Sequence, residues 1–261
     1  MTIAEKAMMG CPISDCCIVD VHMHNARVAN FFSRFDYYAD LVRQMDAIGI
    51  DSGIVSNLWD TGEIWKTHPE ILHMCDQFPG RFYGYLSPNP NTDGFKKELS
   101  QYAEYAVFIG IKLHPTVHMK DLLCQEYRYA YDFAAERGFP VLIHTWGIED
   151  MLRFHDIAAE FPRTTLILGH SGGEEAALRE AIRVAANHDN VYLDTACSYV
   201  WYGAIEAMVR GATAKKVLYG SDAYWNSMEA AVGRIALADI SEEEKRLILG
   251  ENAKRIFHMQ A

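Results

Sequence analysis

Short apolar runs alternate with helical patterns along nearly the whole chain, and this alternation restricts the possible folds more than any other feature. Each run is rich in aliphatic and β-branched residues and has the length of a buried strand. A strand followed by a helix, repeated about every 30 residues, predicts parallel strands joined by crossover helices. The runs lie near residues 17–24, 53–57, 82–88, 107–114, 140–146, 164–170, 190–196 and 216–222.

Helical patterns fill the gaps between these runs. A stripe from Tyr38 to Ile48 and another from Ile71 to Cys75 have helical spacing, and 123–136, 149–160, 174–187 and 201–210 are also predicted helices. Gly138 and Gly211 are predicted to end helices, and the pair Glu174 and Glu175 suits a first helical turn.

These units predict one α/β domain over residues 1–261, a (β/α)₈ TIM barrel, because that fold typically takes about 250 residues. The doubly wound α/β fold is the alternative. It needs a glycine-rich phosphate-binding turn after the first strand, and residues 22–30 contain none.

The first run ends in Asp20-Val21-His22-Met23-His24. Side chains alternate along a strand, so His22 and His24 are expected on one face, with Asp20 available to orient one of the rings. Paired neutral imidazoles are ligands that zinc takes in proteins. The alternative is a pair of packed or solvated histidines.

Other runs also end in polar residues that are able to bind a ligand. The ends carry Lys112 followed by His114, and then His144, His170 and Asp222. In a (β/α)₈ barrel the strand ends meet at one mouth, where catalytic groups lie. The pattern therefore predicts that these side chains converge with His22 and His24.

Together these motifs resemble the amidohydrolase superfamily. The resemblance rests on Asp20-x-His22-x-His24, Gly110-Ile111-Lys112-Leu113-His114-Pro115, His144, Gly169-His170-Ser171-Gly172-Gly173, Gly220-Ser221-Asp222 and the tail from Gly250 to Phe257. It is strongest to the amidohydrolase-related branch that includes aminocarboxymuconate semialdehyde decarboxylase and resorcylate-type decarboxylases. It runs from residue 18 to residue 258.

The resemblance implies a role for each residue. His22, His24, His144 and Asp222 are expected to hold a divalent metal. His170 is expected to bind a second metal or to act as an acid or base. Lys112 occupies the position of a carboxylated bridging lysine in some binuclear members, and the alternative is a cation that holds a substrate carboxylate. We expect one ion, with a second left open, and zinc first with manganese as the alternative.

This residue set serves two reactions. In a hydrolase of amides, lactones or esters, the metal lowers the pKa of water toward about 7, and Asp222 carries the proton to the leaving group. In a non-oxidative decarboxylase of a carboxylated aromatic or unsaturated acid, the same site assists protonation at carbon. Hydrolysis is the first expectation. A barrel that only binds a ligand is the third alternative, and the intact ligand set disfavours it.

Residues after the strands predict a pocket for a small, partly apolar organic substrate. Trp146 follows the fifth run, and tryptophans 59, 201 and 225 follow others. Aromatic walls with few polar groups are common in small-molecule sites. Arg27 follows the first run and is suited to a substrate carboxylate. Trp146, Arg27 and Lys112 are therefore predicted to bind substrate.

Composition excludes several classes of partner. The formal net charge of −11 disfavours nucleic acid and anionic membrane surfaces. No apolar run approaches the roughly 20 residues of a membrane helix, and residues 1–10 lack the apolar core of a signal peptide. Six cysteines without CxxC spacing favour a reduced, cytoplasmic protein. We also expect a homo-oligomer, a dimer, with a small-molecule substrate as its only other partner.

Overall fold

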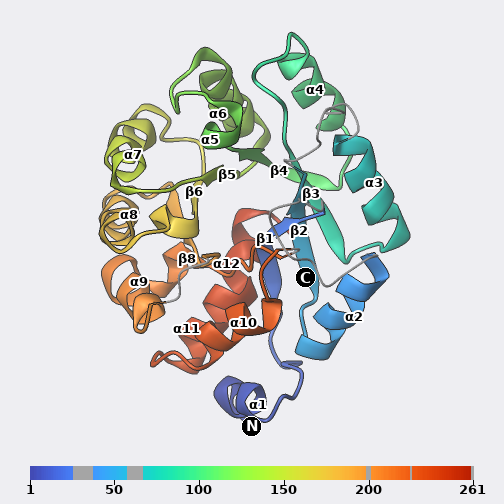
Figure 1. The fold of residues 1–261 in the computed structure, drawn as a ribbon, viewed down its shortest axis with the longest axis vertical. Coiled ribbons are helices and arrows are strands. Elements are labelled where there is room, and N and C mark those ends of the chain that lie inside the picture. Colours follow the sequence, from blue (N-terminus) through green and yellow to red (C-terminus); the bar gives the residue numbers. More distant parts are fainter. Residues whose placement is uncertain (26–37, 58–66, 198–200, 224, 260–261) are drawn as a thin grey trace.

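Eight parallel strands form a nearly closed barrel surrounded by helices (Figure 1). The structure is a computed structural model and describes residues 1–25, 38–57, 67–197, 201–223 and 225–259. The strands follow one another in chain order around the sheet, from β1 to β8. This order confirms the predicted single-domain (β/α)₈ barrel.

Each predicted strand is present, but most are shorter than the apolar run that predicted them. The residues after each strand leave the hydrogen-bonded ladder and form the mouth of the barrel. The strands are β1 (Val19–His24), β2 (Ser52–Ser56), β3 (Phe82–Leu86), β4 (Phe108–Leu113), β5 (Val141–His144), β6 (Leu166–Gly169), β7 (Val191–Asp194) and β8 (Val217–Leu218).

The last strand differs most from its prediction, because β8 ends at Leu218 instead of continuing to 222. Beyond it, the chain closes the barrel against β1 with separate hydrogen bonds. Val21 N donates to Tyr219 O at 3.0 Å, and Asp222 N donates to His22 O at 2.8 Å. Asp222 has a φ of 63°, which a regular strand does not allow.

Helices surround the barrel. The structure has α1 (Ile3–Met8), α2 (Tyr38–Ile48), α3 (Thr67–Gln77), α4 (Phe95–Tyr102), α5 (Pro115–His118), α6 (Gln125–Arg137), α7 (Ile148–Glu160), α8 (Glu175–Asn187), α9 (Ala204–Ala212), α10 (Met228–Ala236), α11 (Glu242–Arg246) and α12 (Asn252–Ile256). Those that match the ranges predicted with bounds, α2, α3, α6, α7, α8 and α9, begin and end within a few residues of them.

Of the two glycines expected to end helices, one does and one does not. Gly138 caps α6 with a φ of 68°. The prediction for Gly211 is wrong, because α9 continues through it to Ala212 and Thr213 is the cap. A Cβ at Gly211 would lie 2.2 Å from Ile182 Cγ2 of α8. Gly211 therefore allows two neighbouring helices to pack closely.

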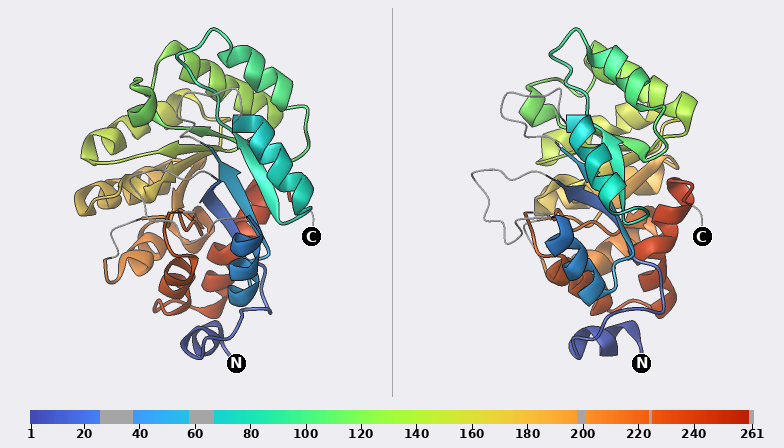
Figure 2. Two further views of the ribbon diagram at one scale, coloured as in Figure 1. Left: turned by 45° about the vertical axis from the view of Figure 1, so that its right-hand side comes forward. Right: turned by 90° about the vertical axis from the view of Figure 1, so that its right-hand side faces the viewer.

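A small apolar cluster inside the barrel separates its two ends. Val19, Val21, Ile54 and Leu142 belong to this cluster, together with Ala253, Ile256 and Phe257 at the C-terminal end of the chain. Helix α12 therefore covers the end where the strands begin (Figure 2). The opposite end, where the strands finish, is left for polar groups.

Within the described ranges, no helix is both long enough and apolar enough to cross a lipid bilayer.

Candidate active site

His22 and His24 lie side by side at the end of β1. Their ring centroids are 5.3 Å apart, and both side chains are almost completely buried. The register of β1 against β2 shifts between Asp20 and Met23, so strict alternation does not hold there. Asp20 consequently does not orient either ring, as the sequence had led us to expect. Its Oδ1 atom accepts hydrogen bonds from the backbone N–H groups of His22 and Ser221.

Asp194, at the end of β7, orients the His22 ring instead. Its Oδ2 atom lies 2.6 Å from His22 Nδ1 and accepts from His170 N at 3.0 Å. Its Oδ1 atom accepts from Ala196 N at 2.9 Å. A carboxylate on one imidazole nitrogen holds the proton there and leaves the other nitrogen free to bind a ligand. Sequence reasoning missed Asp194, although its place at the end of a predicted strand was an available signal.

Gly220 makes room for this pair. A Cβ at this position would lie 2.1 Å from Asp194 Oδ1 and 2.8 Å from His22 Cβ. No side chain fits there without displacing Asp194 or His22. Steric crowding therefore requires glycine at the first position of the Gly220-Ser221-Asp222 sequence.

The chain turns sharply after β8 and brings Asp222 to the same histidines. Asp222 Oδ1 lies 3.1 Å from His24 Nε2 and 3.7 Å from His22 Nε2. Its Oδ2 atom accepts from Asn226 Nδ2 at 3.2 Å. Burial alone would raise the pKa of this carboxyl group, but the His24 imidazole and the neighbouring positive charges hold it below its ordinary value. Asp222 is therefore an ionised carboxylate.

His170 also has a left-handed backbone, with a φ of 66° directly after β6. This conformation directs its ring toward the mouth, 4.8 Å from the His22 ring and 4.7 Å from the His144 ring. Its Nδ1 lies 3.0 Å from Ala196 O, so Nδ1 carries the proton and Nε2 is an acceptor. Burial lowers the pKa of His170 to about 4, and the ring is neutral at pH 7.

His144 lies at the other side of His170. Its ring stacks on His114 with centroids 3.8 Å apart and an interplanar angle of 13°. Trp146 lies nearly parallel to His144 at 6.3 Å and edge-on to His170 at 5.9 Å. Burial lowers the pKa of His144 and of His114, so both rings are neutral. Trp146 is partly exposed and forms an aromatic edge of the site.

Lys112 is completely buried at the centre of this cluster. Its Nζ lies 2.7 Å from His22 Nε2, the nitrogen that Asp194 leaves free. Burial lowers the pKa of Lys112, and the carboxylates of Asp222 and Asp194 oppose that shift. A metal on His22 would therefore compete with the Lys112 amine for the same lone pair, unless the amine moves or is modified.

The donor set fits a divalent transition metal. His22, His170 and Asp222 each offer a ligand atom, and these atoms lie within 4.8 Å of one another. Asp222 Oδ1 is buried and accepts no well-aligned hydrogen bond, as expected of an oxygen that awaits a cation. His24 adjoins this group through Asp222, and His144 adjoins it through His170. Neutral imidazoles with one carboxylate are ligands for zinc and similar ions.

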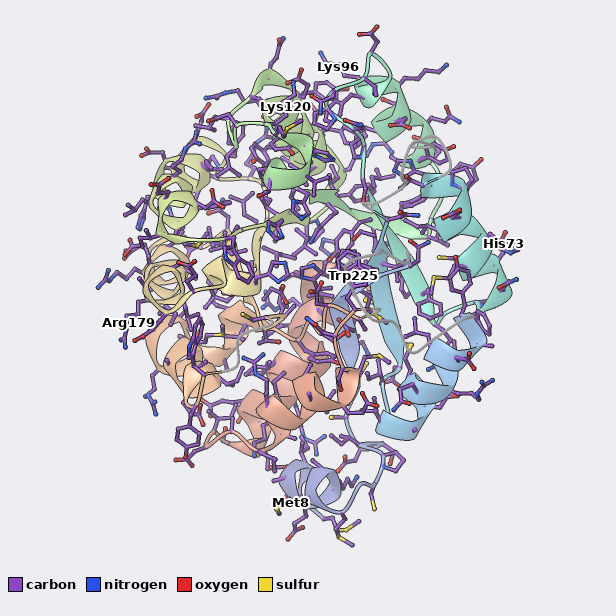
Figure 3. The ribbon with its side chains drawn as sticks, in the orientation of Figure 1. Met8, His73, Lys96, Lys120, Arg179 and Trp225 are labelled. Carbon is purple, nitrogen blue, oxygen red and sulfur yellow. The ribbon has the colours of Figure 1, made fainter. Side chains whose placement is uncertain are left out.

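Two further residues complete the description. Trp225 stacks on His24 with centroids 3.8 Å apart, and Figure 3 shows it over the centre of the barrel. Arg27, a predicted substrate-binding residue, lies outside the described residues.

The barrel and its histidine and carboxylate cluster define an enzyme of the amidohydrolase superfamily. The family model described as Amidohydrolase matches residues 19–259, and the chain belongs to this family. No curated protein sequence matches the chain.

Solved structures share the fold at low identity. A 5-carboxyvanillate decarboxylase from Sphingomonas paucimobilis has a TM-score of 0.73 and 14% identity, with 94% of this chain and 100% of that chain covered. A 2,6-dihydroxybenzoate decarboxylase from Rhizobium has a TM-score of 0.72 and 15% identity, with 94% and 100% covered. A 5-carboxyvanillate decarboxylase from Novosphingobium aromaticivorans, with bound manganese, has a TM-score of 0.73 and 14% identity, with 94% and 98% covered.

Proposed function

We propose that this protein is a metal-dependent hydrolase of a small organic amide, lactone or ester. One observation carries the proposal: the ionised Asp222 carboxylate lies 3.1 Å from His24 Nε2 within a cluster of neutral, buried histidines. A carboxylate in this position is able to accept a proton from water and pass it to a leaving group.

Different side chains of the site are proposed to bind the metal, to orient its ligands and to accept a proton. His22, His170 and Asp222 would hold the cation, because their ligand atoms lie within 4.8 Å of one another, and the adjoining His24 and His144 would complete this site or help to hold a second ion. A divalent ion held there would lower the pKa of water toward about 7. Asp194 keeps the proton on His22 Nδ1, and Asn226 steadies the Asp222 oxygen that faces away from His24. The neutral His170 ring, with Nδ1 tied to Ala196 O, presents Nε2 as an acceptor.

The mouth of the barrel supports a partly apolar substrate. Trp146 would provide an aromatic wall beside His144 and His170. Lys112 would hold an oxyanion or a carboxylate beside His22. Arg27 remains a proposed carboxylate ligand on the basis of its position in the sequence.

Decarboxylation is the second candidate, and a specific observation favours it. The buried Lys112 amine adjoins the cluster, where it is suited to a substrate carboxylate. The decarboxylases with similar folds are consistent with this reaction, and the manganese in one of them makes manganese a candidate metal beside zinc.

Turnover in ¹⁸O-labelled water distinguishes the two reactions. The metal-loaded protein is first screened with lactones, amides and esters against carboxylated aromatic acids, with Asp222→Asn as the inactive control. Hydrolysis requires that solvent oxygen enters the organic product. Release of carbon dioxide, with a solvent proton on product carbon and no oxygen incorporation, would overturn the proposal in favour of decarboxylation.

A further inference from the structure

A hollow of about 200 Å³ lies beside the candidate active site, between the ends of β7 and β8 and the helix α10. Its lining includes Cys197 after β7, Ser221 and Asn226 after β8, and Ala230 and Arg234 of α10. Asn226 connects it to the site, because its amide donates to Asp222 Oδ2 at 3.2 Å. The hollow is thus one side chain away from the proposed catalytic carboxylate.

Arg234 is the charged group of this hollow. Its Nη1 atom donates a hydrogen bond to Thr195 O at 3.0 Å. Thr195 follows Asp194 in the chain, so this bond holds the guanidinium near the end of β7. A guanidinium has five N–H donors, and this is the single hydrogen bond that Arg234 makes to the described residues. Its other N–H groups have no hydrogen-bond partner among the described residues.

Arg234 is half-buried and forms no ion pair with the described residues, a combination that the other arginines of those ranges do not share. Within the described ranges, eight arginines form ion pairs: Arg43, Arg81, Arg128, Arg137, Arg153, Arg179, Arg183 and Arg246. Arg163, Arg210 and Arg255 form none there either, but these three are exposed to solvent. Arg234 is half-buried, and burial lowers its pKa, so solvent compensates its charge less than on the surface. A partly desolvated guanidinium gains from a bidentate anion.

Neither of the neighbouring acidic residues, Glu206 and Asp194, forms an ion pair with Arg234. A second hollow of about 370 Å³ is also lined by Arg234 and has Glu206 in its lining. Glu206 Oε1 accepts a hydrogen bond from Asp239 N at 2.9 Å and lies outside ion-pair distance of Arg234. Asp194 acts on Arg234 only at a distance, because its two oxygens accept from His22, His170 and Ala196.

We propose that Arg234 and the hollow beside Asn226 form a subsite for a carboxylate group of the substrate. The subsite holds an anionic arm beside the β8 end of the mouth, while the bond to be broken lies against Asp222 and the histidines. The volume suits a carboxylate with a short arm and is below the 300 Å³ or more of a pocket for a whole drug-sized ligand. That the ligand is a substrate depends on the proposed function, but the binding of carboxylate does not.

Binding of 4-fluorobenzoate, followed by ¹⁹F NMR on the metal-loaded full-length protein, tests the subsite. The neutral 4-fluorobenzamide is the matched probe. Arg234→Gln removes the charge, and Ala230→Leu fills the hollow from an exposed helical position. Arg210→Gln is the control, because Arg210 is an exposed arginine on the neighbouring helix α9. Each titration is repeated on chelator-treated protein, which separates this subsite from a carboxylate held by a metal.

Both hollow variants are expected to weaken 4-fluorobenzoate binding about tenfold or more, as the loss of a charge-assisted contact does. The expected change for Arg210→Gln is less than twofold, and Arg234→Gln leaves 4-fluorobenzamide binding unchanged. The difference between wild type and Arg234→Gln is expected to persist after chelation.

If Arg234 only caps the Thr195 carbonyl, Arg234→Gln lowers Tm without changing the affinity for 4-fluorobenzoate, and the proposal is overturned. Equal binding by Ala230→Leu and wild type overturns it independently of any folding defect at Arg234. An inactive protein that shows the Arg234-dependent binding contradicts the proposed function and leaves the subsite intact.

Discussion

Replacement of Asp194 by asparagine tests how the His22 ring is prepared for a ligand. The carboxylate accepts from three N–H groups, with His22 Nδ1 at 2.6 Å, His170 N at 3.0 Å and Ala196 N at 2.9 Å. An amide has one acceptor oxygen, and its NH₂ group only donates. In either orientation the NH₂ group of asparagine faces at least one of these N–H donors. The variant also loses the negative charge that favours a proton on His22 Nδ1.

The expected magnitude follows from these contacts. Loss of a carboxylate that orients a histidine ligand weakens metal binding by about 10- to 100-fold, or about 1.4 to 2.7 kcal/mol. One unmatched buried N–H lowers the free energy of unfolding by about 1–3 kcal/mol. The fold is expected to persist, because Asp194 lies at the mouth and the apolar interior of the barrel is unchanged.

Zinc affinity is measured by competition with a chromophoric chelator, and circular dichroism monitors folding. Asp156→Asn is the matched control, since Asp156 is an exposed residue of α7 and is not part of the candidate site. If Asp194→Asn binds zinc within twofold of wild type, other contacts orient the His22 ring and the reasoning is wrong.

Three other changes have definite expected results. Asp222→Asn should lower kcat by several orders of magnitude at equal metal occupancy, because an amide does not carry the proton. Asparagine tolerates the left-handed backbone at this position, so the fold is expected to persist. If the loss of kcat follows metal occupancy alone, Asp222 is only a ligand. Purified protein should contain at least one zinc or manganese ion per chain by elemental analysis, and His22→Ala should lose it while circular dichroism stays unchanged; no metal and no uptake of added zinc would contradict the assigned site. Burial lowers the pKa of His68 from 6.5 to about 4, so on acidification the unfolded chain binds a proton at a higher pH than the folded protein does. The free energy of unfolding therefore decreases by up to about 3 kcal/mol as the pH falls from about 6.5 to about 4. Urea unfolding across this range should show a shallower pH dependence for His68→Gln, and an unchanged slope would contradict the assignment.

The sequence predicted the barrel because its signals are local. Apolar runs, helical stripes and the Gly138 stop depend on neighbours within a few residues, and the structure reproduces them. The same argument placed His22, Lys112 and Asp222 at strand ends, and the topology brings them together at one mouth. These positions follow from chain order, since parallel strands in a barrel end on the same side.

Features that depend on contacts between distant segments needed the tertiary structure. Alternation along β1 predicted Asp20 as the partner of a histidine ring, but the shifted register and the approach of β7 give that role to Asp194, 172 residues from His22. Lys112 contacts His22 although the two residues are 90 positions apart in the sequence. The close packing of Gly211 against Ile182 likewise brings together two different helices. A sequence pattern reports which side chains share a face of one element. Which of them touch across elements is decided by the register and packing of the whole barrel, because those are set by all the strands and helices together.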